Sequence, residues 1–383
     1  MKRIIMIGMD VHSKEHVLCA VEPQLCGEPE ILAERKVPAD VKNVLQFVRE
    51  LQVAYEDPTG LNELEFQCGY EAGCLGYSLY NQLMAAGLQC VILAPTTMME
   101  ERGRRVKTDA RDAHQIAKCL AFGVYKAVHI LDETDHGVRS YMRMRTDKKK
   151  ARKILMQQIT AHLRLLGFNY EKTKWTQAHL AWLKDVQKEI SDPYDRLVLR
   201  EQLVDYESLT ADIERYDKEI ESIAQMPRYE KAKELGCLLG MSTISSVAVM
   251  SEIGDFERFD KGSTFAAYLG LAPGEHSSGD HVRRTGISKA GNSNLRRILI
   301  EASQGICRGI PGHKSKALKA RQAGNSLEII AYADKANIRL RKKYNRMIRS
   351  GKSRNVAVAA IARELACFIW GIMTGNIHDR SAA

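Results

Sequence analysis

The first 125 residues predict a fixed order of secondary structure, in which three strands are followed by alternating helices and strands. Apolar runs bounded by turn residues indicate strands, and apolar residues three and four positions apart indicate helices. The predicted strands cover residues 4–8, 16–22, 31–37, 65–70 and 89–93, and the predicted helices cover residues 40–51, 76–86 and 109–122. This order predicts an α/β domain with a mixed sheet and helices on its faces.

The region from about residue 136 to residue 226 contains one proline, Pro193, and its apolar residues keep helical spacing. The simplest interpretation is two long helices that meet near Pro193, as an αα-hairpin or a coiled coil. Helical spacing returns from residue 293 to the end. We therefore expect three domains: the α/β domain over residues 1–130, a helical coiled-coil region over 131–230 and a mainly α-helical domain over 231–383.

The chain is basic, with 57 Lys and Arg against 47 Asp and Glu, which gives a net charge of +10 over 383 residues. Basic residues gather in residues 138–153, which hold eight of them beside one acid, and in residues 283–297 and 339–354. Such runs form either a solvated helix face or a surface that contacts the phosphates of a nucleic acid. A run this one-sided favours the phosphates.

Nine scattered cysteines without a C-x-x-C pair argue against a disulfide framework and a zinc ribbon, and they fit a reducing cytoplasm. The first residues lack a long apolar run and a small-residue cleavage site, so we expect no signal peptide. Residues 72–99 carry no charge, but glycines, amides and Pro95 divide them into a helix-like and a strand-like piece. We therefore expect no membrane span.

Four carboxylates occupy positions where an α/β sheet gathers reacting groups. Asp10 and Glu71 each end a predicted strand, while Asp109 and Asp112 lie one turn apart on a predicted helix. Any one of these acids is more often a helix cap or a surface residue than a ligand. Together they would repel one another by about 3 kcal/mol per pair at 5 Å, so we expect cations among them. Two Mg²⁺ ions bridged by carboxylates activate phosphodiester chemistry in this way.

A second candidate centre lies in a Gly-rich loop of the C-terminal region, at Ser277 and Ser278 before Gly279. A serine that attacks a phosphodiester needs nearby positive charge to stabilise the developing oxyanion. The alternative interpretation of this Ser-Ser-Gly sequence is an ordinary turn. The basic residues that follow the loop are Arg283, Arg284 and Lys289.

Two weaker signals accompany these centres. Residues 239–250 resemble a helix-hairpin-helix, in which a Gly-containing turn at a helix N-terminus offers N–H groups to a phosphate. His12 is two residues from Asp10 and therefore on the same face of the strand. A lone histidine is more often structural than catalytic, and His12 is the histidine of this chain that we expect to be the exception.

The N-terminal motifs resemble those of a known enzyme family. Residues 8–13, 70–73 and 107–113 are similar to the motifs of the DEDD insertion-sequence transposases, which are relatives of the Piv DNA invertases. The resemblance implies a ribonuclease H-like, RuvC-type fold for the α/β domain. The four carboxylates match the D-E-D-D set that binds Mg²⁺ in this family.

The C-terminal region resembles the transposase domain of the same family. Residues 268–273, 278–279 and 286–297 carry this resemblance. Ser278 matches the family's nucleophilic serine, and Ser277 is the neighbour with which it could be confused. The resemblance also implies a homo-oligomer, dimer or tetramer, whose subunits share a composite site.

The family resemblance further implies partners. These are donor DNA, target DNA and a structured bridge RNA that pairs with both, in the bacterial cytoplasm and associated with the nucleoid. Base pairing by a guide would explain why the sequence shows no recognition helix or zinc finger. The residues that we expect to contact nucleic acid are Lys107, Arg143, Arg145, Lys149, Arg283, Arg284, Lys289, Arg296 and Arg297.

Two other functions stay open at this point. A metal-dependent, junction-resolving nuclease would use water in place of Ser278. A nucleic-acid-binding scaffold without chemistry would need neither the serine nor the four acids, and the sequence retains them all.

Overall fold

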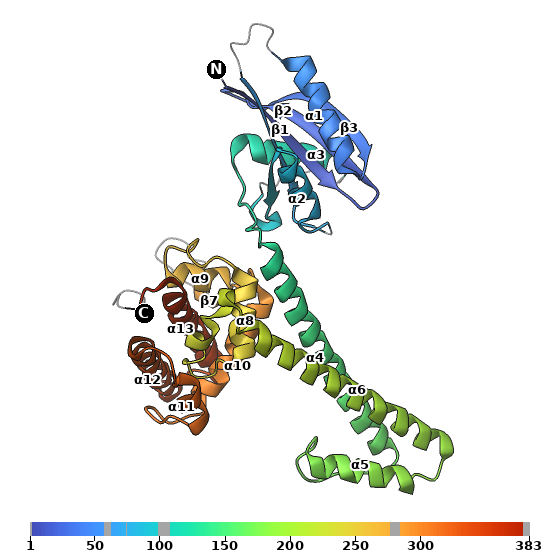
Figure 1. The fold of residues 1–383 in the computed structure, drawn as a ribbon, viewed down its shortest axis with the longest axis vertical. Coiled ribbons are helices and arrows are strands. Elements are labelled where there is room, and N and C mark those ends of the chain that lie inside the picture. Colours follow the sequence, from blue (N-terminus) through green and yellow to red (C-terminus); the bar gives the residue numbers. More distant parts are fainter. Residues whose placement is uncertain (1, 57–62, 74, 99–107, 276–283, 378–383) are drawn as a thin grey trace. The chain divides into compact units, whose positions relative to one another are not determined.

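The computed structural model describes residues 2–56, 63–73, 75–98, 108–275 and 284–377. The chain divides into two compact units, Met1–Ile130 and Leu131–Ala383. We describe each unit by itself (Figure 1). The division of the sequence into three domains stays a prediction.

The first unit contains the predicted mixed sheet. Its strands are β1 (Lys2–Val11), β2 (Glu15–Glu22), β3 (Glu30–Pro38), β4 (Glu63–Glu71) and β5 (Gln89–Leu93), in the order β3-β2-β1-β4-β5. Strands β1, β2 and β3 pair antiparallel, whereas β4 pairs parallel with both β1 and β5. The α/β expectation for this unit is confirmed.

Helices cover both faces of this sheet. On one face, α1 (Val41–Tyr55) and α2 (Ser78–Ala85) pack against buried Ile5, Ile7 and Met9 of β1. On the other face lies α3 (Asp109–Phe122), whose alanines pack against β2. Because side chains alternate along a strand, the even-numbered residues of β1 point toward α3. A short 3₁₀ helix (Pro95–Thr97) follows β5.

The middle region contains three helices where the sequence predicted two. They are α4 (Glu133–Leu165), α5 (Gln177–Glu189) and α6 (Pro193–Ile223), and α4 runs beside α6 (Figure 1). Gly167, with φ +83°, follows the end of α4, and the Thr176 hydroxyl caps α5 by accepting the N–H of His179. Pro193 begins α6, as expected of a proline at the first helical position. The coiled coil stays a prediction.

The rest of the second unit is mainly helical, as expected. Its elements are a 3₁₀ helix (Pro227–Tyr229), α7 (Ala232–Leu235), α8 (Thr243–Ile253), α9 (Gly262–Tyr268), β6 (Pro273–Glu275), β7 (Arg284–Ile287), α10 (Ser293–Cys307), α11 (Lys316–Gln322), α12 (Leu327–Arg349) and α13 (Arg354–Thr374). Strands β6 and β7 form a small antiparallel pair. Helix α13 is long and apolar enough to cross a membrane, but two thirds of its apolar stretch is buried, mainly against α9, α10 and α12.

Candidate active site

Two of the predicted acids lie at the same level on neighbouring parallel strands. In the β1–β4 pair, Gly8 lies opposite Gly69 and Met9 opposite Tyr70. The next residues in this register are Asp10 and Glu71, so both lie at the carboxyl ends of their strands. Both also point toward α3, because Gly8 and Gly69, two residues earlier, contact that helix.

Helix α3 brings the other two acids to this edge because it packs directly on the backbone of β1. A Cβ atom at Gly8 would lie within 3.0 Å of the backbone of Ala113 and Ala117, closer than real Cβ atoms approach. Both alanines are fully buried. The small residues on each side therefore set the first turn of α3, with Asp109 and Asp112, above the end of β1.

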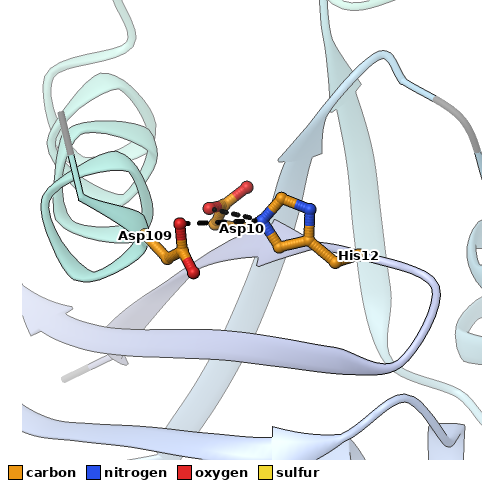
Figure 2. Close-up of side chains that lie close together, drawn as sticks. All are labelled: Asp10, His12 and Asp109. Carbon is orange, nitrogen blue, oxygen red and sulfur yellow. Dashed lines mark hydrogen bonds and ion pairs between the residues drawn. The ribbon is translucent and has the colours of Figure 1, made fainter.

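Two of these acids, Asp10 and Asp109, lie close to His12 (Figure 2). His12 Nε2 lies 3.2 Å from Asp10 Oδ2 and 3.9 Å from Asp109 Oδ1. One potential ligand atom from each residue lies within 4.8 Å of the other two. The contact of His12 with Asp10 agrees with their predicted common face.

Electrostatics around Asp10 indicate a place for positive charge. Burial raises the pKa of the Asp10 carboxyl, and the negative charges of Asp112 and Asp109 raise it further, while His12 opposes the shift. Asp112 is therefore near enough to act on Asp10. A bound cation would relieve the repulsion that these carboxylates exert on one another.

The donor set fits a divalent cation. Carboxylate oxygens of Asp10 and Asp109 are the ligands that Mg²⁺ prefers, and Glu71 and Asp112 lie at the same edge. The imidazole of His12 is a softer ligand that also suits Mn²⁺ or Zn²⁺. A divalent metal is consistent with this geometry.

Around the second predicted centre, the structure describes only strands β6 and β7 and the segments next to them. Ser277, Ser278 and Arg283 lie outside the described residues, as does Lys107, and the segment with both serines joins β6 to β7. The segments before and after this pair of strands are held together by backbone contacts. A Cβ atom at Gly291 would lie within 3.0 Å of the Tyr268 oxygen, and Gly291 has φ +84°.

Arg296 of α10 links the segment before β6 to the segment after β7. Its Nη1 donates to the Leu269 oxygen at 3.0 Å and to the Ala290 oxygen at 3.4 Å. A Cβ atom at Gly270 would also lie within 3.0 Å of the Ala290 oxygen. The two C-terminal motifs therefore pack on each other, and Arg296 has a structural role besides any contact with nucleic acid.

Several of the basic residues predicted to contact nucleic acid lie together in the second unit. Arg143, Arg145 and Lys149 of α4 line one groove with Arg297 of α10. Arg284 begins β7, and Lys289 adopts φ +58° in the loop before α10. Sequence reasoning missed Glu252, a buried acid of α8 that binds Arg143 in this groove.

Comparison with known proteins gives the family. The profile described as "Transposase IS116/IS110/IS902 family" matches residues 232–314, and a second profile, described as "Transposase", matches residues 7–167. A protein of Sinorhizobium fredii that carries the name transposase y4qE is 30% identical over 97% of this chain and 88% of its own length. The transposase for insertion sequence element IS1533 of Leptospira borgpetersenii is 29% identical over 91% of this chain and 97% of its own length.

Among solved structures, the "Thermus thermophilus RuvC structure" matches 32% of this chain and 99% of that chain, with 13% sequence identity and a TM-score of 0.22. The two profiles match the first unit and parts of the second, and the match to the relative from Sinorhizobium fredii covers nearly the whole chain. The chain therefore belongs to the IS116/IS110/IS902 family and is an insertion-sequence transposase.

Proposed function

We propose that this transposase cuts and rejoins DNA with two Mg²⁺ ions at the acidic edge of its first unit. Asp10, Glu71, Asp109 and Asp112 hold the ions. The observation that carries this proposal is the convergence of Asp10 and Asp109 on His12 where β1 ends. The mixed sheet, with its acids at the ends of parallel strands, supports the ribonuclease H-like, RuvC-type assignment.

The bound ions supply positive charge that stabilises the oxygens of a phosphodiester under attack. The chain's own contribution is orientation. Gly8 and the alanines of α3 fix the distance between helix and strand, and His12 contacts both Asp10 and Asp109. The side chains then need little rearrangement when substrate arrives.

Ser278 is the proposed nucleophile. Its hydroxyl oxygen attacks phosphorus, the bond from phosphorus to the leaving strand breaks, and the leaving oxygen takes up a proton. The phosphoserine link keeps the strand activated until the hydroxyl of another strand attacks phosphorus and releases the serine. Arg283, Arg284 and Lys289 follow the serine in the sequence and would supply positive charge for this step. The close packing of Gly291 on Tyr268 and the hydrogen bond from Arg296 to Leu269, which hold the segments on either side of the β6–β7 pair, support this role.

Target choice by a bridge RNA is the second part of the proposal. The RNA pairs with donor and target DNA, and the protein binds backbones through its basic segments. The protein works as a homo-oligomer in the bacterial cytoplasm, in which the acids of one subunit act with the serine of another. The basic groove of the second unit supports binding to backbones.

The alternative is a junction-resolving nuclease that uses water in place of the serine. The acidic edge alone favours neither chemistry, because both need it. The pair Ser278→Ala and Ser277→Ala separates them, since the substitutions are adjacent and chemically identical. With Ser278→Ala we expect loss of strand cleavage and of any covalent protein–DNA species on denaturing gels, while Ser277→Ala keeps both. Full cleavage by Ser278→Ala would contradict the serine mechanism.

The RNA partner needs a separate experiment. The transposase is purified from cells that carry its insertion sequence, and the co-purified RNA is sequenced. We expect enrichment of a structured RNA from the non-coding end of the element. Recovery of bulk cellular RNA alone would contradict guidance.

A further inference from the structure

A groove of about 520 Å³ lies in the second unit between α4, α8 and α10. Helix α4 forms one wall, the turn before α8 and its first residues form the second, and α10 forms the third. Its charged lining residues are Arg143, Arg145, Lys149, Lys150, Lys153, Glu252, Arg297 and Glu301. Six cations thus face two acids, and two of the cations also pair with acids outside the lining, Arg145 with Asp217 and Lys150 with Asp147.

The two acids are already engaged by cations of the groove. Glu252 accepts from Arg143 Nε and Nη2, each at 2.9 Å, and Glu301 accepts from Arg297 at 3.0 Å. Within the part of the chain that the structure describes, Lys149 and Lys153 form no ion pair within 4.0 Å. Spaced four residues apart, they lie on the same face of α4.

Lys149 is crowded by like charge. Partial burial in the groove lowers the pKa of its ammonium, and the positive charges of Arg145 and Arg297 lower it further, against an opposing effect of Glu301. An anion placed in the groove would reverse this effect. The charge of the groove therefore favours an anionic ligand.

The walls are fixed before any ligand arrives. Glu252 is 7% exposed, and its Oε2 also accepts from Asn292 Nδ2 at 2.7 Å. Asn292 in turn caps α10 through the N–H of Leu295. One buried carboxylate therefore links α4 to the start of α10, so little conformational freedom is lost when a ligand binds.

The turn before α8 and the first residues of that helix form the second wall of the groove. Gly240, with φ +87°, approaches α10 so closely that a Cβ atom would lie within 3.0 Å of the Ala302 backbone. Ser242 caps α8 and lines the groove with Ser245. The positive end of the α8 dipole therefore adds to the potential of the lysines.

We infer that this groove binds the sugar–phosphate backbone of a nucleic-acid strand, with Lys149 and Lys153 on neighbouring phosphates. Point charges of this kind neutralise phosphates without reading bases, so we expect binding that does not depend on sequence. The inference deepens the proposed function and rests on it for the identity of the strand, which is either the transposase's DNA or its guide RNA.

The test is a double variant, Lys149→Ala with Lys153→Ala, in the full chain. Its matched control is Lys316→Ala with Lys319→Ala, because these lysines lie in the same unit, are exposed on α11 and form no ion pair among the described residues. Fluorescence anisotropy measures the Kd for two unrelated DNA duplexes and for a structured RNA over a salt titration. Circular dichroism checks that both variants are folded.

We expect the groove variant to bind about tenfold more weakly and its slope of log K against log salt to fall by about two, because two phosphate contacts are lost. The control variant keeps the slope of the wild type. A loss confined to DNA or to RNA supports the inference and identifies the strand, and an equal loss for both supports a general backbone site. An unchanged slope and Kd for all three probes would overturn it.

The same measurements separate this inference from the proposed function. Asp10→Asn is expected to lose cleavage, whereas binding in the groove is judged only from the salt slopes of the wild type, the groove variant and the lysine control. If the wild type cleaves no DNA, the proposed function is wrong, but the salt slopes still test whether the groove binds nucleic acid. If cleavage is normal and the salt slope of the groove variant equals that of the wild type, only the inference about the groove is wrong.

Discussion

Gly8 of β1 lies directly against the backbone of Ala113 in α3, with no room between them for a methyl group. Asp10 follows Gly8 by two residues on the same strand, and Asp109 precedes Ala113 by one helical turn. This contact therefore sets the separation of the two carboxylates that approach His12.

Substitution of Gly8 by alanine is expected to move α3 away from β1. The added methyl group meets backbone atoms, so relief requires a helix shift that costs about 1–3 kcal/mol of unfolding free energy. We expect Gly8→Ala also to weaken binding of Mn²⁺, measured by titration calorimetry. The control is Gly137→Ala in α4, where nothing lies within 4 Å and alanine should stabilise by about 0.5–1 kcal/mol. Wild-type stability and Mn²⁺ affinity in Gly8→Ala would show that the contact does not position the acids.

Asp10 is expected to make the metal-free protein less stable as pH rises. Its pKa in the folded state is raised, mainly by burial, so its contribution to stability is fully present below its ordinary pKa and is lost as pH rises through the folded value. In EDTA, the difference in unfolding free energy between wild type and Asp10→Asn should therefore move in favour of the variant as pH rises. Urea unfolding at several pH values measures this difference.

Addition of Mg²⁺ at neutral pH should stabilise the wild type and leave Asp10→Asn nearly unchanged, because ligand binding to the folded state raises its stability. An equal gain in both proteins would mean that Asp10 is not a ligand. Glu50→Gln, at an exposed acid of α1, serves as the control and should respond to Mg²⁺ as the wild type does.

Much of the first unit could be predicted from local pattern. Each strand and helix expected there is present, because apolar periodicity follows burial on one face of the sheet. The grouping of Asp10 with Asp109 was also predictable, since strand ends and the first turn of a following helix meet at one sheet edge. Their common neighbour His12 was suggested by its spacing from Asp10.

Other features depend on long-range packing that periodicity does not encode. The break between α4 and α5 depends on the positive φ of Gly167, and nothing in the spacing of leucines distinguishes it from a longer helix. Glu252 lies in an apolar helix, and its partners Arg143 and Asn292 are 109 and 40 residues away. Such a pairing is visible only once the helices are packed.

Gly291 is expected to be essential for the packing of the segments on either side of the β6–β7 pair. Alanine there faces both a positive φ and the Tyr268 oxygen, so we expect a loss of about 2–4 kcal/mol and of strand transfer. Gly312→Ala is the matched control, because Gly312 has a similar φ but nothing within 4 Å, and it should cost only about 1 kcal/mol. Thermal unfolding and a strand-transfer assay measure both. Equal losses in the two variants would rule out a role for the contact with Tyr268.

Glu252 is expected to matter more for stability than the other acid of the groove. Glu252→Gln keeps the shape of the side chain but leaves Arg143 and Asn292 around a neutral, buried amide, which should cost about 1–3 kcal/mol of unfolding free energy. Glu301→Gln removes an exposed partner of Arg297 and should cost at most about 0.5 kcal/mol. Urea unfolding compares the two.

Because each variant also removes one negative charge from the groove, both should bind DNA at least as tightly as the wild type at low salt, provided that α4 stays in place. Weaker binding by Glu252→Gln alone would indicate that its pair with Arg143 holds the α4 wall in position, whereas equal stability of the two variants would show that this pair does not order the groove.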